Sequence, residues 1–276
     1  LHAYQATGNP FYSDVAQETL DYILREMTDS QGGFYSTQDA DSEGEEGKYF
    51  VWTPGEIEMA MGSHDSAVLQ RYFGVTHEGN FEGRSILYRP QDASEVAQGF
   101  GLEPGELLTI VEKGKAALLE ARGQRVPPST DTKVLTSWNG LMLHSMAMGA
   151  AILHRDDYLQ AAIANASFIL QNMRDGHRLL RTYKDGQAKL KGYLEDYTCL
   201  ANGLLALYEA TFDYSWLKEA QVLAQQIMEL FWDEEEGVFY DTGIDHETLL
   251  IRPRDVSDGA MPSGSAMAAD VLLRLS

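Results

Sequence analysis

The sequence repeats one pattern of apolar residues three times, and this repeat limits the possible folds more than any other feature. Starting from Tyr12, Tyr158 and Trp216, an aromatic residue, an alanine, an isoleucine and a methionine or phenylalanine occur at offsets 0, 4, 11 and 15. These offsets fall on one stripe of a helix with 3.6 residues per turn, and polar side chains fill the opposite side. The pattern predicts three amphipathic helices, each with one face in solvent.

A second set of segments alternates with these outer helices. They are apolar on nearly all sides, rich in small residues, and aligned on Gly140, Gly203 and Gly264, about sixty residues apart. Such helices are buried and pack closely, so we expect Asn139, Asn202 and Ser263 at the starts of inner helices. The alternation predicts an all-α fold of stacked helical hairpins, either an open solenoid or a closed (α/α)6 toroid.

Six hairpins of this spacing would need roughly 360 residues, so the 276 residues predict a single toroid domain, 1–276, that is incomplete and a fragment of a larger chain. Residues 36–136 depart from the repeat and form an insertion or an elongated hairpin. Within it, residues 48–52 are β-prone, and Thr53, Pro54 and Glu56 have the spacing of a helix start. We therefore expect a short β insertion that leads into helices, one of them over 107–122.

Composition excludes several classes of protein. Lys and Arg number 21 against 42 Asp and Glu, and the net charge of −21 disfavours nucleic acid and anionic membranes as partners. A hydrophobic content of 44%, without an apolar run of roughly 18 to 20 residues, predicts a soluble protein. The single cysteine, Cys199, excludes an internal disulfide and thiolate-rich metal sites, and it favours a reducing, cytoplasmic compartment.

Four stretches carry a resemblance to a known family. They are residues 32–52 (GGFYSTQDADSEGEEGKYFVW), 79–83 (GNFEG), 131–140 (DTKVLTSWNG) and 195–197 (EDY). They are similar to the YyaL / spermatogenesis-associated protein 20 family, and the match runs along essentially the whole chain. The resemblance implies a six-hairpin glycosidase-like domain whose partner in the full-length chain is a thioredoxin-like domain. That domain and its cysteines are absent here, so no redox activity is expected of this chain.

The acidic loop, residues 39–46, is the sharpest local feature. Asp39, Asp41 and Glu43 satisfy the first positions of a calcium loop, but Phe50 stands where an EF-hand needs a bidentate glutamate. Three interpretations stay open: a divalent cation held by Asp39, Asp41 and Glu43, a solvated turn, or a substrate-facing loop that borders the main cavity. Apart from this possible cation, no cofactor is expected.

Carboxylates precede each inner helix: Asp131, then Glu195 and Asp196, then Asp255 and Asp258. In a helical toroid these positions share one rim, where a ligand cavity lies. Glycoside hydrolysis needs a protonated and an ionised carboxyl group about 5 to 10 Å apart. The alternative for each residue is a helix-start acid that stabilises the helix dipole. The predicted catalytic residues are Asp196, as first choice, with Asp131, Asp39 and Asp41.

Aromatic side chains beside these acids favour sugar binding, because sugar rings stack on aromatic rings. Lys133 and Asn139 offer hydrogen bonds to hydroxyl groups. The predicted substrate-binding residues are Tyr35, Trp52, Lys133, Trp138, Asn139, Glu195, Tyr197 and Asp258.

Together these features predict glycosidase-like hydrolysis of a carbohydrate or similar polyol. A sugar epimerase is the first alternative; it would need two bases near one sugar carbon, for which His144 and His246 are the candidates. A non-catalytic carbohydrate-binding or scaffold domain that partners the thioredoxin-like domain is the second. Serine-hydrolase, phosphate-loop and dinucleotide motifs are missing.

Overall fold

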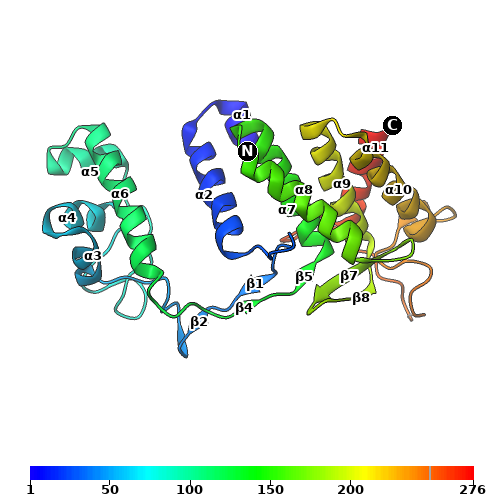
Figure 1. Cartoon of the computed structure of the whole chain (residues 1–276), viewed down its shortest axis with the longest axis horizontal. Helices are drawn as coiled ribbons and strands as arrows, with labels where there is room; N and C mark the ends of the chain where they lie inside the picture. Colours follow the sequence, from blue (N-terminus) through cyan, green and yellow to red (C-terminus); the bar gives the residue numbers. More distant parts are fainter. Residues whose placement is uncertain (249) are drawn as a thin grey trace. The chain divides into compact units, whose positions relative to one another are not determined.

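The computed structural model describes residues 1–248 and 250–276 and divides into two compact units (Figure 1). Unit 1 comprises Leu1–Thr37 and Asp131–Ser276, and unit 2 comprises Gln38–Thr130. The chain passes from one unit to the other within β1 (Thr37–Gln38) and again within β4 (Thr130–Asp131). The segment expected to depart from the repeat, 36–136, therefore contains all of unit 2.

Unit 1 is built from helices in two rows. They are α1 (His2–Thr7), α2 (Pro10–Glu26), α7 (Thr136–Leu153), α8 (Asp156–Asn172), α9 (Leu194–Thr211), α10 (Tyr214–Phe231) and α11 (Gly264–Leu275). In the inner row α9 packs against both α7 and α11, while α8 packs on α7 and α10 packs on α9 as outer helices. This alternation is that of an (α/α) toroid and confirms the predicted fold class.

The predicted apolar stripes explain how the outer helices attach. On α8, Tyr158, Ile169 and Met173 are completely buried, and on α10 Ile227 and Phe231 are completely buried as well. Each large side chain buried in this way contributes about 1.5–3 kcal/mol. The stripes on α8 and α10 are therefore the faces that hold the outer row onto the inner row.

The inner helices α7 and α9 approach each other through glycines. A Cβ atom on Gly140 would lie 2.5 Å from the backbone nitrogen of Leu200, and one on Gly203 would lie 2.6 Å from the Gly140 oxygen. Asn139 lies in the first turn of α7 as predicted, but Asn202 lies in the middle of α9, so its predicted place at a helix start is wrong. Gly203 marks the crossing with α7 and not the beginning of α9.

Short strands follow the outer helices and lead back to the inner row. They are β5 (Val134–Leu135), β6 (Arg174–Asp175), β7 (Arg178–Lys184), β8 (Gln187–Lys191), β9 (Trp232–Asp233) and β10 (Val238–Phe239). Strand β7 pairs antiparallel with β5, β6 and β8. The β7–β8 hairpin was not predicted from the sequence.

Unit 2 is mainly helical. Its elements are β2 (Asp41–Ser42), β3 (Glu45–Glu46), α3 (Pro54–Met61), α4 (Ser63–Tyr72), α5 (Ala93–Phe100) and α6 (Pro104–Arg122). Thr53 and Glu56 form the predicted capping box at the start of α3. The strand expected over 48–52 is wrong, because Val51 and Trp52 are both buried instead of alternating, and the backbone turns at Gly47.

Candidate functional site

The starts of the three inner helices meet at one end of unit 1, where β5, β7 and β8 also lie (Figure 1). The Ser137 N–H in α7 donates to Asp196 Oδ1 at 3.0 Å, and the Leu194 N–H donates to the Asp241 carbonyl at 2.9 Å. A Cβ atom on Gly264, the first residue of α11, would lie 3.0 Å from Leu194. We call this end the inner-helix rim. It is formed by residues 131–139, 193–197, 241–246 and 255–264.

Asp196 joins the starts of α7 and α9. Besides the Ser137 bond, its Oδ2 atom accepts from the Tyr193 N–H at 2.9 Å and from Arg181 Nη1 at 3.0 Å. Burial raises the pKa of Asp196 to about 6, against the opposing effects of Arg181 and the backbone donors. Its side chain is 0% exposed, so this geometry makes Asp196 a positioning residue, and a direct catalytic role stays a prediction.

Glu195 shares the same arginine but faces solvent. Its Oε1 atom lies 2.7 Å from Arg181 Nη1, and its side chain is 31% exposed. The Arg181 guanidinium also lies over the Tyr193 ring, 4.6 Å from the ring centroid. One guanidinium therefore holds two neighbouring carboxylates, one buried and one accessible.

Asp241 is a rim carboxyl group that the sequence analysis missed. Burial raises its pKa, and the charges of Asp255 and Glu195 act in the same direction, while a hydrogen bond from the Asp255 N–H opposes them. That bond is 2.8 Å long and fixes Asp241 Oδ2. The sequence held a signal for it, since Asp241 directly follows the aromatic residue Tyr240.

Asp131 lies between two lysines. Lys184 Nζ is 2.9 Å from Asp131 Oδ1, and Lys133 Nζ is 3.3 Å from Oδ2. The Lys184 hydrogen bond is the main cause that lowers the pKa of Asp131 to about 2, so this carboxyl group is ionised at neutral pH. Both lysines line a cavity of about 340 Å³ on the β7–β8 hairpin. Lys133 thus lies beside Asp131 in a basic part of the rim, and its contact with substrate stays a prediction.

Three other predicted rim residues are held by bonds within the protein. Asp258 Oδ1 accepts from the Ser263 N–H at 2.9 Å, just before α11. The Tyr197 hydroxyl is buried and accepts from the Leu179 N–H at 2.9 Å. Asn139 is buried and donates to the Phe34 carbonyl while accepting from the Phe34 N–H. Their contacts with substrate stay predictions, because a substrate would have to replace the hydrogen bond that each side chain makes within the protein.

The two remaining aromatic candidates in unit 1 differ in their environment. Trp138, in the first turn of α7, is 41% exposed and its ring is accessible for stacking. Tyr35 is half-buried, and its hydroxyl donates to Asp29 Oδ2 at 3.1 Å. Burial and the Asp29 carboxylate raise the pKa of Tyr35. Trp138 is therefore the aromatic side chain best placed to meet a ligand.

The acidic loop lies in unit 2 and forms the β2–β3 hairpin. Glu43 and Gly44 occupy its turn with φ angles of 54° and 79°. Lys48 Nζ lies 2.9 Å from Glu45 and 3.4 Å from Glu43, so an ammonium group already neutralises part of the loop. Within residues 1–248 and 250–276, no group of three or more His, Cys, Asp or Glu side chains is arranged to hold a metal ion.

The other predicted residues of unit 2 are also placed. Asp39 Oδ1 accepts from the Asp41 N–H at 3.2 Å, and Asp39 Oδ2 accepts from the Ser129 hydroxyl at 3.3 Å. Trp52 is buried in the unit 2 core. The catalytic roles of Asp39 and Asp41, and a cation bound with Glu43, stay predictions.

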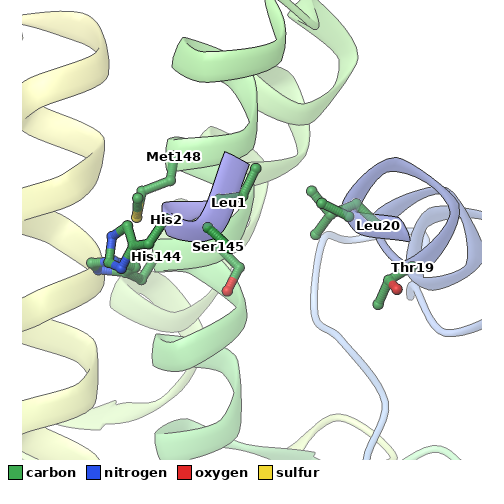
Figure 2. A pocket seen from close by; sticks show the side chains of 9 residues that line it. Leu1, His2, Thr19, Leu20, His144, Ser145 and Met148 are labelled. Atoms are coloured by element: carbon green, nitrogen blue, oxygen red, sulfur yellow. The ribbon is translucent and has the colours of Figure 1, made fainter. Parts of the chain in front are cut away.

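The two candidate histidines line separate cavities. His144 lies in the middle of α7 beside a cavity of about 450 Å³, where burial lowers its pKa. Figure 2 shows His144 grouped with His2 and Met148 on one side of this cavity, and Thr19 on the other side. His246 lies at the rim beside a cavity of about 280 Å³, and its ring packs 5.3 Å from that of Tyr193. Only His246 is therefore part of the rim.

Among the described residues, no helix is both long enough and apolar enough to cross a membrane. No model of a known protein family matches this chain. In solved structures, similar backbones include the unsaturated glucuronyl hydrolase of Bacillus sp. GL1, with a TM-score of 0.45 and 13% identity over 99% of this chain and 71% of that chain. The cellobiose 2-epimerase of Bacillus thermoamylovorans matches with a TM-score of 0.39 and 9% identity over 85% of this chain and 60% of that chain.

Sequence similarity to curated proteins is stronger. Human spermatogenesis-associated protein 20 is 34% identical over 99% of this chain and 39% of that protein, and the mouse protein is 33% identical over the same shares. An uncharacterized protein of Caenorhabditis elegans is 27% identical over 91% of this chain and 38% of its own length. The chain thus spans about two fifths of the length of these relatives. Over that span, it belongs to the spermatogenesis-associated protein 20 family.

Proposed function

We propose that the inner-helix rim binds a carbohydrate or a similar polyol and hydrolyses a glycosidic bond with Asp241 and Glu195. One observation carries the proposal: Asp241 has a raised pKa beside Glu195, which is the carboxylate of an accessible ion pair. Such hydrolysis requires one carboxyl group that donates a proton and a second one that acts as nucleophile or base. The exposed ring of Trp138 on the same rim supplies a surface for sugar stacking.

In this mechanism Asp241 gives its proton to the glycosidic oxygen as the bond from that oxygen to the anomeric carbon breaks. Glu195 either attacks the anomeric carbon, which leads to retention, or removes a proton from the attacking water, which leads to inversion. Arg181 positions Glu195 at 2.7 Å, and Asp196 fixes Arg181 from the buried side. Water supplies the hydroxyl group of one product. In retention Asp241 regains its proton from that water, and in inversion Glu195 takes this proton and releases it to solvent, from which Asp241 is protonated again.

A panel of p-nitrophenyl glycosides and unmodified disaccharides tests the proposal on the whole chain. Asp241→Asn and Glu195→Gln should each lower kcat on the order of 10²-fold to 10⁴-fold, because each removes one proton-transferring or nucleophilic group. Glu219→Gln is the matched control, since Glu219 also pairs with an arginine at 2.7 Å but lies on the outer helix α10. Full activity of either rim variant would remove that residue from the catalytic pair.

A sugar epimerase is the second candidate, and His246 favours it. Its Nε2 atom is buried without a hydrogen-bond partner among the described residues, while its Nδ1 atom accepts from the Gly243 N–H at 2.9 Å. Because Nδ1 accepts, the neutral imidazole carries its proton on Nε2, and this N–H is a suitable acid for returning a proton to a sugar carbon after a rim carboxylate has removed one from the other face. Incubation of reducing disaccharides in D₂O would then give deuterium at carbon 2, and His246→Gln would abolish that exchange.

The partners and location of the whole protein belong to the same proposal. We infer a thioredoxin-like domain elsewhere in the full-length chain and a cytoplasmic location. If the panel gives saturable sugar binding without turnover or exchange, the rim is a carbohydrate-binding module that serves that partner domain.

A further inference from the structure

Unit 2 contains a pocket of about 290 Å³ that no part of the proposed hydrolysis uses. It is lined by Ser42, Glu43, Lys48, Tyr49, Glu56, Arg84, Gln124, Arg125 and Val126. All these residues belong to unit 2, and none belongs to the inner-helix rim. Several come from residues 42–52, part of the longest stretch that resembles the family, so the proposed function leaves this stretch unexplained.

Two guanidinium groups in this pocket share one carboxylate oxygen. Arg84 Nη2 lies 2.6 Å from Glu56 Oε1, and Arg125 Nη2 lies 3.2 Å from the same atom. The other oxygen, Oε2, accepts from the Thr53 N–H at 2.8 Å and from the Thr53 hydroxyl at 2.9 Å. Glu56 is thus fully engaged and supplies one negative charge against two positive charges.

Arg125 is held in place by the protein itself. Its Nη1 atom donates to the Tyr49 carbonyl at 2.9 Å and to the Val51 carbonyl at 2.8 Å, and its guanidinium lies 4.0 Å from the centroid of the Trp52 ring. Burial lowers the pKa of Arg125, and the positive charge of Arg84 adds to this effect while Glu56 opposes it. Because the Arg125 side chain is already fixed, binding of an anion would not cost the conformational entropy of ordering it.

Arg84 has donors that the chain does not use. A guanidinium carries five N–H groups, and the Arg84 side chain makes the single described bond to Glu56. Its Nε atom is buried without a hydrogen-bond partner among the described residues. Nearby, Lys48 is occupied by Glu43 and Glu45, so the excess of donors is concentrated at the two arginines.

We propose that this pocket, here called the arginine pocket, binds a small oxyanion, namely the carboxylate or phosphate group of a polar molecule. The planar fork of a guanidinium matches the spacing of two oxygen atoms in a carboxylate or a phosphate. Glu56 neutralises one of the two guanidinium groups, so one positive charge remains to attract the anion. The proposal is independent of hydrolysis at the rim.

Isothermal titration calorimetry of the whole chain tests the proposal, with inorganic phosphate and acetate as separate ligands and sodium chloride holding the ionic strength constant. We expect saturable binding with one site for at least one of these anions, and the tighter anion identifies the chemical group. Arg84→Gln should weaken binding at least tenfold, because Arg125 and Glu56 then balance each other. Arg71→Gln, on exposed α4 surface outside the pocket, removes the same charge and should leave binding unchanged.

Two results would overturn the proposal: the absence of saturable binding for both anions, or equal weakening by Arg71→Gln, which would reveal only a general charge effect. If circular dichroism shows that Arg84→Gln does not fold, Arg84→Lys decides. Lysine keeps the charge but loses the planar fork, so we expect weakening by several-fold, and unchanged affinity would contradict the proposed geometry.

Discussion

Two clusters of arginines and carboxylates, one in each unit, have opposite stoichiometry. At the inner-helix rim one guanidinium, Arg181, holds Glu195 and Asp196 at 2.7 and 3.0 Å. In unit 2 one carboxylate, Glu56, faces Arg84 and Arg125 at 2.6 and 3.2 Å. The first cluster has an excess of one negative charge, which suits proton transfer and hydroxyl binding. The second cluster has an excess of one positive charge. The net charge of −21 for the whole chain does not predict which ligand either site attracts, because that depends on the charges within the site.

The largest effect should come from the buried carboxylate of the rim. Asp196→Ala leaves Arg181 and the N–H groups of Ser137 and Tyr193 without their acceptor, so we expect a loss of about 3–5 kcal/mol in the free energy of unfolding. Urea denaturation measures it. Glu195→Ala is the matched comparison and should cost less than about 1 kcal/mol, because that ion pair is partly exposed. Equal losses would show that the two acids do not divide into a positioning and an accessible residue.

The second largest effect on stability should come from the distance between α7 and α9, the helices that carry the rim. Gly140→Ala places a Cβ atom 2.5 Å from the Leu200 nitrogen, which forces α7 and α9 apart and costs about 1–3 kcal/mol. Gly105→Ala in α6 is the control in unit 2, and there a gain in helix propensity of up to about 1 kcal/mol is expected. Thermal unfolding of both variants gives the comparison, and a stable Gly140→Ala would mean that α7 and α9 do not touch at this point.

Glu56→Gln tests the opposite stoichiometry of unit 2. It leaves two guanidinium groups without a carboxylate and weakens the α3 capping box, so we expect a loss of about 1–2 kcal/mol in low-phosphate buffer. Added phosphate should restore part of this stability and should bind more tightly than to the parent chain. The same concentration of phosphate should not change the stability of Glu195→Gln. Weaker phosphate binding by Glu56→Gln would show that Glu56 recruits the anion instead of competing with it.

Two of the rim carboxyl groups, Asp196 and Asp131, should affect stability with opposite dependence on pH. The pKa of Asp196 is raised from 3.8 to about 6, so its contribution to stability is present below about 3.8 and is lost as the pH rises through 6. The pKa of Asp131 is lowered to about 2, so its contribution is present above about 3.8 and is lost as the pH falls toward 2. Carboxyl ¹³C NMR titration measures both midpoints, and a midpoint for Asp196 below that of Asp131 would reverse this assignment.

The sequence predicted the helical framework because that framework depends on periodicity. The stripes beginning at Tyr158 and Trp216 determine which faces of α8 and α10 are buried, and local capping chemistry at Thr53 sets the start of α3. The glycine alignment failed at Asn202 for a physical reason. A glycine at a helix crossing, such as Gly203, and a glycine at a helix start, such as Gly264, look alike in sequence because both permit a close approach to a neighbouring helix.

The candidate site was harder to predict because it depends on pairing between distant segments. Arg181 lies on the β7–β8 hairpin. Among the described residues, α10 is followed by the shorter β9–β10 pair, so the contact of Arg181 with Glu195 and Asp196 carries no periodic signal. The acids before inner helices were recognisable by position, but their burial was not. Asp196 is enclosed and Glu195 is accessible although they are adjacent, since successive residues of a helix face different directions.

A crystal structure of Glu195→Gln soaked with disaccharides is the sharpest test of hydrolysis at the rim, because the variant should bind substrate without cleaving it. We expect sugar density at the inner-helix rim, with the glycosidic oxygen within hydrogen-bond distance of Asp241 and a sugar ring against Trp138. Sugar bound elsewhere in unit 1, with the Asp241 carboxyl group untouched, would contradict it.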